Sequence, residues 1–304
     1  MKRGLIEWDR TQLPPAVLDS RLARVRAALA AQNLPALLVY TDVWRSNQAR
    51  FLTNFMPYWN RSLVVIPVDS PPVLLCALSP RVYPWIKSVT ILENIRPASK
   101  LMQTLDQLCA ERQWRRLGVL DLPMLPIEIH SRLGEIEIVD VPSETICEPD
   151  DGEFSMRRRA VSRARQILEE QLPRGAGSLD HHFVGHLERE FRRAGAEDLV
   201  IRLSSAGGSP APAKGARLLD RYSVAIALEY CGHWVKVTRP SADAEALRSR
   251  FDAALAAGLS SDGGHIENLA GPYPYEAGTG SIFALHVEHQ GLYFGDTCTG
   301  TGAL

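Results

Sequence analysis

The tetrapeptide HVEH at positions 286–289 places a histidine and a carboxylate where they could act together. Side chains alternate between the two faces of a strand, so His286 and Glu288 fall on one face and His289 on the other. A carboxylate beside an imidazole fixes its tautomer and raises its basicity. We therefore expect His286, assisted by Glu288, to act as a general base. The competing explanation is that both are polar residues with a structural role alone.

A second group of reactive side chains lies in the segment VAIALEYCGHWVKVTRP at positions 224–240. Two apolar runs flank its central glycine, which predicts a β-hairpin. The polar residues of this hairpin that are candidates for catalysis are Glu229, His233 and Lys236.

Two histidines and one carboxylate form a set that suits zinc or iron. A mononuclear site built from His233, His286 and Glu288 is therefore conceivable, although nothing in the spacing requires one. We expect no metal and no other cofactor.

The elements that position these residues fall into two halves. The first half alternates helical and strand patterns, which predicts a mixed α/β sheet covered by helices. Helices are expected at 15–34, at 98–114 and at the start of 125–141, and strands at 35–41, 47–55, 61–69, 71–78, 116–122 and the end of 125–141. The charged segment CEPDDGEFS at 147–155 then marks a boundary, which gives domains at 1–149 and 150–304.

The second half has a different pattern of elements. Two helices are expected at 156–172 and 179–195, followed by short strands at 223–231, 233–240, 281–289 and 292–298. Short strands joined by tight turns predict an α+β domain with antiparallel hairpins rather than parallel crossovers.

Composition excludes several classes of partner. A net charge of −1 provides no field that would gather nucleic acid or anionic lipid. No run of about 18 apolar residues is present, so we expect no membrane association. The five cysteines are scattered without CxxC spacing, which is typical of a reducing compartment. We expect a cytoplasmic protein whose partner is a small-molecule substrate.

The order of these signals resembles one protein family. The run RLARVRAALAAQNLPALLVYTDVWRSNQARFLTNF and the following RSLVVIPVDSPPVLL are similar to the N-terminal domain of the creatinase, aminopeptidase P and prolidase family. The stretches GAGSLDHHFVGHLEREFRRAGAED, LLDRYSVAIALEYCGHWVKVTRP and SIFALHVEHQGLYFGDTCTGTGAL resemble the family's pita-bread domain. The resemblance implies a creatinase-like first domain followed by a shortened, degenerate pita-bread domain.

The resemblance also implies two divalent metal ions, held by two aspartates on the hairpin, one histidine, and two glutamates on the last strands. The aspartate positions fall on Ala225 and Lys236, and the glutamate positions on His286 and Gly295. The ammonium of Lys236 would repel a dication. Only His265 is left as a counterpart of the family's histidine. We therefore expect that the chain is not a dimetal peptidase.

Creatinase offers a metal-free precedent within the family, because it hydrolyses a small guanidino compound with a histidine base upstream of the hairpin. The corresponding loop here, SSAGGSPAPAKGARLLD at 204–220, contains no histidine and has Ser209 near that position. The creatinase mechanism therefore does not carry over directly, and other groups would supply any catalysis.

If the family fold holds, one concave sheet brings together His286 and Glu288 with His233, Glu229, Lys236 and Asp296. The expected catalytic residues are His286, Glu288, Lys236, His233 and Glu229. The resemblance implies a homodimer in which the segment MPYWNR at 56–61 lies near the partner's site, where it either binds substrate or only packs at the interface. The expected substrate-binding residues are Tyr58, Trp59, Arg61, Arg239, Asp296 and His265.

Three functions follow from these expectations. The first is a metal-independent hydrolase or lyase that acts on a small amino-acid-derived, amide or guanidino metabolite by general acid–base chemistry. The second is a non-catalytic pseudoenzyme that binds a metabolite or a partner protein. The third and most distant is a metallopeptidase.

Overall fold

The structure is a computed structural model that describes residues 7–131, 133–134, 136–205, 207–257, 264–269, 282–300 and 302–304. The chain divides into two compact units between Glu148 and Pro149, beside the boundary expected near residue 150. None of the helices in the described ranges has the length and apolar character needed to cross a membrane.

The first unit is built on a six-stranded mixed sheet with the order β4-β3-β2-β1-β5-β6. Strands β1, β2 and β3 pair in antiparallel fashion, whereas β3 with β4, β1 with β5 and β5 with β6 are parallel. The strands are β1 (Ala36–Thr41), β2 (Ser62–Pro67), β3 (Val73–Cys76), β4 (Asn94–Pro97), β5 (Arg116–Leu120) and β6 (Glu137–Val141). The predicted mixed sheet is confirmed.

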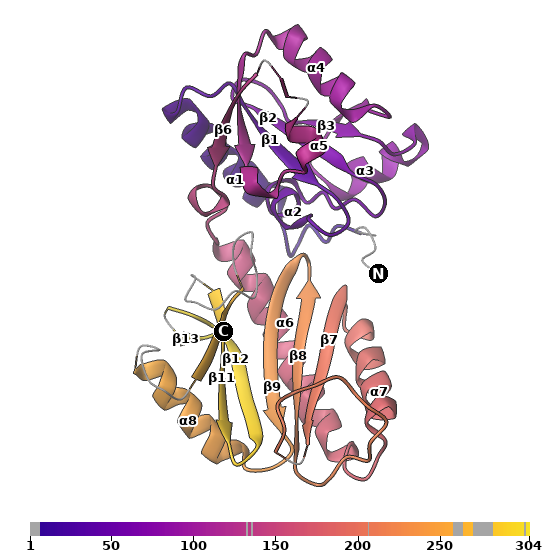
Figure 1. Cartoon of the computed structure of the whole chain (residues 1–304), viewed down its shortest axis with the longest axis vertical. Helices are drawn as coiled ribbons and strands as arrows, with labels where there is room; N and C mark the ends of the chain where they lie inside the picture. Colours follow the sequence, from indigo (N-terminus) through magenta and orange to yellow (C-terminus); the bar gives the residue numbers. More distant parts are fainter. Residues whose placement is uncertain are drawn as a thin grey trace. The chain divides into compact units, whose positions relative to one another are not determined.

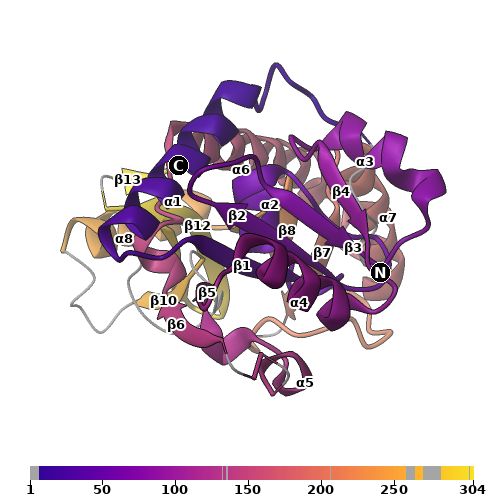
Figure 2. The same cartoon turned by 90° about the horizontal axis from the view of Figure 1, so that it is seen from above.

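Helices cover both faces of this sheet (Figure 2) because each of its central strands is apolar on both sides. One apolar core joins the sheet to α1 (Pro15–Ala31), α2 (Asn47–Thr53) and α3 (Tyr83–Val89). The other core joins it to α4 (Leu101–Arg112) and α5 (Ile127–His130). Near-continuous apolar strands of this kind are typical of sheets that are buried on two sides.

The segment 47–55, which we expected to be a strand, is instead the helix α2. The expectation was wrong because a short apolar run does not distinguish a strand from a buried helical turn by its periodicity. Phe51 and Leu52 pack into the core of the first unit, and Asn54 ends the helix in a left-handed conformation with φ of 59°. Asparagine tolerates that conformation better than most residues do.

The second unit is an antiparallel sheet with the order β10-β11-β12-β9-β8-β7, to which β13 adds beside β12. Figure 1 shows β12, β9, β8 and β7 of this sheet side by side. The strands are β7 (Asp198–Ser205), β8 (Tyr222–Tyr230), β9 (His233–Pro240), β10 (Gly264–Asn268), β11 (Ile282–His289), β12 (Leu292–Thr299) and β13 (Gly302–Ala303). The predicted α+β domain with antiparallel hairpins is confirmed. Residue 281, the expected first residue of the third strand, lies outside the described residues.

Three helices pack on one face of this sheet, which we call the helix-covered face. They are α6 (Asp151–Gln171), α7 (Asp180–Arg193) and α8 (Ala244–Ala256). The first two pack on β8 and β9, and the third packs on β11 and β12. The opposite face carries His286 and is called the His286 face below.

The long helix α6 begins at a defined polar cap. The carboxylate of Asp150 accepts a hydrogen bond from the backbone N–H of Glu153 at 3.0 Å, which satisfies one of the free donors of the first turn. The following residues at helical spacing, among them Ala160, Ala164 and Leu168, are buried against the sheet. The Arg-rich start of this segment therefore belongs to an amphipathic helix.

The loop between β7 and β8 is tied down by a carboxylate of α7. Asp180 accepts hydrogen bonds from the backbone N–H groups of Lys214 and Gly215, each at 2.8 Å. Ser209, the residue expected near the position of the creatinase histidine, lies in this loop. In the sequence it falls between Leu203 and Ala211, which form an isolated β-bridge.

Candidate functional site

Strand pairing builds a row of side chains across the His286 face. Lys236 on β9 pairs with Ala227, and its backbone N–H donates to Thr297 Oγ1 on β12 at 2.8 Å. Thr297 pairs with Ala284 on β11, and Ala284 pairs with Glu267 on β10. One row therefore leads from Lys236 to Glu267 across β12 and β11, whose residues in this row, Thr297 and Ala284, have short side chains.

A second row runs beside the first. Ala225 pairs with Thr238, Thr238 with Gly295, Gly295 with His286, and His286 with His265. The positions that the family resemblance assigns to metal ligands, other than that of Lys236, all lie in this row. The two rows together form the candidate site.

The first row is closed by an ion pair between Lys236 and Glu267, in which the lysine Nζ donates to the carboxylate. Strands β12 and β11 lie between them, so the two backbones are about 14 Å apart at a spacing of about 4.8 Å per strand. Both side chains must therefore extend over Thr297 and Ala284 to meet. Their exposed fractions are only 19% and 18%, so the pair is largely withdrawn from water.

Two effects oppose each other at the Glu267 carboxylate. Burial favours its neutral form, but the hydrogen bond and the charge of Lys236 outweigh that effect and hold the pKa of Glu267 below its usual value. His265 adds a contact from its Nε2 to the same carboxylate at 3.2 Å. Glu267 is therefore an anion at neutral pH.

His286 is held at one ring nitrogen and left unpaired at the other. Its Nδ1 lies 3.1 Å from Thr238 Oγ1. Its Nε2 is buried and has no hydrogen-bond partner among the residues that the structure describes. Burial and the charge of Lys236 lower the pKa of His286 to about 4, against an opposing effect of Glu267. The imidazole is consequently neutral at pH 7.

The position of the His286 ring depends on the absence of a side chain at Gly295. A Cβ atom added to Gly295 would lie 2.3 Å from His286 Nδ1 and 3.0 Å from its Cε1. It would also lie 2.8 Å from the backbone oxygen of Leu285. The ring of His286 therefore occupies the space that a longer residue at position 295 would need.

His233 does not join this site. It is three residues from Lys236, which by alternation puts it on the helix-covered face, where its Nδ1 lies 3.4 Å from Glu153 Oε1. Arg157 pairs with the same carboxylate at 2.6 Å. The expected convergence of His233 with Lys236 and His286 is thus wrong, and so is a mononuclear metal site that would include it.

Asp296 and Arg239 also lie on the helix-covered face. The Arg239 guanidinium donates to the Asp296 carboxylate at 2.8 Å, and Arg165 of α6 pairs with the same carboxylate at 3.0 Å. Asp296 and Arg239 have only 2% and 5% of their surface exposed. This buried cluster ties α6 to the sheet, so the expected convergence of Asp296 with Lys236 and His286 was wrong, and Arg239 also points away from the His286 face.

The remaining predicted catalytic residues lie on the His286 face but in different settings. Glu229 is fully buried on β8, next after Ala227 on that face. Glu288 is exposed, and its carboxylate accepts a hydrogen bond from the backbone N–H of Gly291 at 2.6 Å in the turn after β11. Glu288 lies on the same face as His286, as expected. Its carboxylate, however, caps the turn after β11 and does not contact the imidazole.

The aromatic residues predicted to bind substrate lie in the first unit, in the connection before β2. Trp59 is 69% exposed and Tyr58 is 41% exposed. Arg61 pairs with Glu128 at 2.6 Å. Their role in binding substrate stays a prediction.

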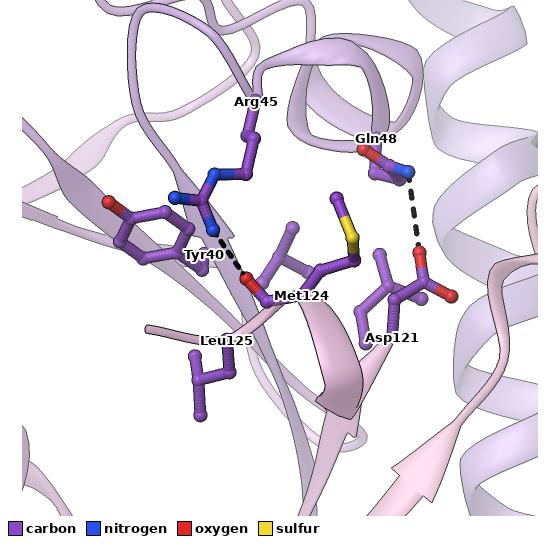
Figure 3. Close-up of a pocket in the computed structure, with 8 residues that line it drawn as sticks. Tyr40, Arg45, Gln48, Asp121, Met124 and Leu125 are labelled. Atoms are coloured by element: carbon purple, nitrogen blue, oxygen red, sulfur yellow. Dashed lines mark hydrogen bonds between the residues drawn. The ribbon is translucent and has the colours of Figure 1, made fainter. Parts of the chain in front are cut away.

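The first unit also contains a small hollow at the carboxyl ends of the parallel strands β1 and β5 (Figure 3). The Arg45 guanidinium spans it to the backbone oxygen of Met124 at 2.7 Å, and the Gln48 amide donates to Asp121 at 3.3 Å. Ligands often bind at such an edge of an α/β sheet. This hollow, however, holds about 20 Å³, which is room for about one water molecule. It is too small to hold a metabolite.

Two residues of the candidate site escaped the sequence analysis. Glu267 was missed because β10 was not predicted, although the alternation of His265 and Glu267 in GGHIE was a usable signal. Thr238 was seen only as part of the hairpin frame, because its contact with His286 depends on the pairing of β9 with β12.

The mixed sheet of the first unit and the antiparallel, helix-covered sheet of the second are the two domains that the family resemblance implies. No family model matches the sequence, and no curated protein matches it. Solved structures do match over most of the chain. An X-Pro aminopeptidase from Thermotoga maritima MSB8 superposes with a TM-score of 0.70 and 13% identity, covering 91% of this chain and 94% of that one.

Two further structures show the same likeness. An Xaa-Pro dipeptidase from Bacillus anthracis gives a TM-score of 0.70 and 14% identity over 94% of this chain and 96% of that chain. A prolidase from Pyrococcus furiosus gives a TM-score of 0.68 and 12% identity, covering 93% of this chain and 98% of that chain. The chain therefore has the fold of X-Pro aminopeptidases and prolidases, as the resemblance predicted. Identities this low show the fold alone.

The residues present do not fit the dimetal centre that the resemblance implies. The ammonium of Lys236 stands at one of the metal-ligand positions. At a second ligand position, Gly295, a glutamate side chain would have no room because the ring of His286 lies against it. Within the described ranges, no group of three or more His, Cys, Asp or Glu side chains is arranged to hold a metal ion.

Proposed function

We propose that the chain is a metal-independent enzyme that acts on a small amino-acid-derived, amide or guanidino metabolite by general acid–base chemistry on the His286 face. The observation that carries this proposal is the buried Nε2 of His286, which has no partner in the described part of the chain. A buried polar atom without a partner is costly, so it points to a group that a ligand would supply. The adjacent charged pair of Lys236 and Glu267 supports a polar ligand.

The chemistry follows from the two ring nitrogens of His286. When Nδ1 carries the proton and donates it to Thr238 Oγ1, Nε2 holds a lone pair that can accept a proton. Water then loses a proton to Nε2 as its oxygen bonds to the amide or guanidino carbon. The ammonium of Lys236 binds a negatively charged group of the substrate and so orients the reacting carbon beside His286. Nε2 returns the proton to the leaving nitrogen as the C–N bond breaks.

One observation favours the second candidate, a protein that binds without catalysis. Lys236 and Glu267 neutralise each other, as polar residues would that only fill a former metal site. The two candidates differ in turnover, so a single experiment separates them.

The test is a screen for activity on a panel of small amides and guanidines, followed by kinetics of His286→Ala and Lys236→Ala. We expect each change to lower kcat/KM by about 100-fold or more, as is usual for the loss of a positioned acid–base group. The matched control is His182→Ala, an exposed histidine on α7. Activity that survives both changes would refute the assignment of the site, and a panel without any turnover would favour the binding protein.

We further propose a homodimer in which Tyr58, Trp59 and Arg61 contribute to the substrate site of the partner. The large exposed fractions of Tyr58 and Trp59 support an intermolecular role, since exposed aromatic side chains are enriched at interfaces. Mixing inactive Trp59→Ala protein with inactive His286→Ala protein should restore activity, because some mixed dimers hold one intact site. Mixed samples that stay inactive, or a monomeric mass in light scattering, would refute this arrangement.

A further inference from the structure

We propose that the ion pair of Lys236 and Glu267 recognises a small zwitterion, whose carboxylate takes the lysine while its ammonium or guanidinium group takes the glutamate. The inference rests on the proposed function, because it names the substrate class of the same site. It is carried by the contacts of the pair and by its place in the sheet.

The charge of the site selects a ligand that is itself neutral overall. Lys236 and Glu267 are each less than a fifth exposed, at 19% and 18%. A ligand with a single charge would draw one of them away and leave the other poorly solvated and unpaired, which is unfavourable. A zwitterion exchanges one ion pair for two and leaves no charge without a partner.

The placement of the pair gives such a ligand a place to lie. Lys236 is anchored on β9 and Glu267 on β10, with β12 and β11 between them. The side chains beneath the pair are those of Thr297 and Ala284, which are short. When the two charged side chains separate, the body of the ligand can lie over these residues with its charged ends toward the anchors.

The same arrangement brings the middle of the ligand to His286. Its row adjoins the row of the ion pair, because Gly295 and Thr297 are alternate residues of β12. A carboxylate bound at Lys236 would offset the positive charge that lowers the pKa of His286. Binding of the correct ligand would therefore make the imidazole a stronger base.

Three matched probes test this inference by calorimetry: 4-aminobutanoate as the zwitterion, butanoate as the anion and butylammonium as the cation. The comparison is repeated with chains one carbon shorter and one longer. We expect the best zwitterion to bind at least about tenfold more tightly than either singly charged probe of the same length. NMR titration should show the pKa of His286 rising on binding of the zwitterion.

Two variants assign the charges. K236M should abolish the advantage of the zwitterion over butylammonium, and E267Q should abolish its advantage over butanoate. The wild-type comparison decides the matter if either variant fails to fold, which circular dichroism would reveal.

The inference is overturned if the three probes bind equally, if no zwitterion binds at any length, or if folded variants keep the wild-type preference. These outcomes are separate from those of the proposed function. Zwitterion binding without turnover supports the recognition of charge and refutes catalysis. Turnover of uncharged amides without a preference for zwitterions supports catalysis and refutes the recognition of charge.

Discussion

Replacement of Gly295 by alanine tests whether the position of the His286 ring depends on the absence of a side chain at residue 295. The added Cβ would lie 2.3 Å from His286 Nδ1, far inside any van der Waals contact, so the ring must move. Overpacking of a filled site costs about 1–3 kcal/mol. Displacement of the ring also breaks its hydrogen bond with Thr238, which is worth about 1 kcal/mol. We expect Gly295→Ala to lower the free energy of unfolding by about 2–4 kcal/mol.

A double-mutant cycle assigns this cost to the imidazole. In a His286→Ala background the ring contacts are absent, and the tightest remaining contact is the 2.8 Å approach to the backbone oxygen of Leu285. Gly295→Ala should therefore cost less there, with a coupling energy of at least about 1 kcal/mol.

The assay is urea denaturation of the wild type, both single variants and the double variant at neutral pH. Parallel slopes of the transitions would show that the four proteins unfold in the same way. Equal costs of Gly295→Ala in the two backgrounds, within about 0.5 kcal/mol, would show that the ring and residue 295 are independent. That result would refute the reasoning.

Two further predictions concern pH and burial. Because burial and the charge of Lys236 lower the folded-state pKa of His286 to about 4, the unfolded chain takes up a proton first as the pH falls below about 6.5. Stability should decline from about pH 6.5 to 4, by roughly 2–3 kcal/mol, and His286→Gln should remove this part of the slope in denaturation curves. Asp296→Ala leaves the guanidinium groups of Arg165 and Arg239 without their carboxylate. We expect it to lower the free energy of unfolding, measured by urea denaturation, by about 3–5 kcal/mol. A decrease below about 1 kcal/mol would contradict the structural role of Asp296.

The sequence was most informative where a local rule decides the outcome. Alternation along a strand places His286 and Glu288 on one face, and the structure agrees. The same rule separates His233 from Lys236 by an odd number of residues, so their expected convergence conflicted with the strand's own geometry. The fold was accessible because the order of helices and strands follows apolar periodicity.

The sequence was least informative where distant strands meet. The ion pair of Lys236 with Glu267 joins β9 and β10, which are separated in the sheet by two strands that come later in the chain. No local pattern gives that pairing register. The dependence of His286 on Gly295 likewise requires the pairing of β11 with β12 residue by residue.

The metal content of the purified protein tests the central claim most directly. The protein is incubated with manganese, cobalt and zinc, freed of unbound ions and measured by elemental analysis, and its thermal unfolding is compared before and after a chelator. Because Lys236 and Gly295 replace two ligands, we predict well below one equivalent of each metal and an unchanged Tm. A stoichiometric metal whose removal lowers the Tm would contradict a metal-independent site.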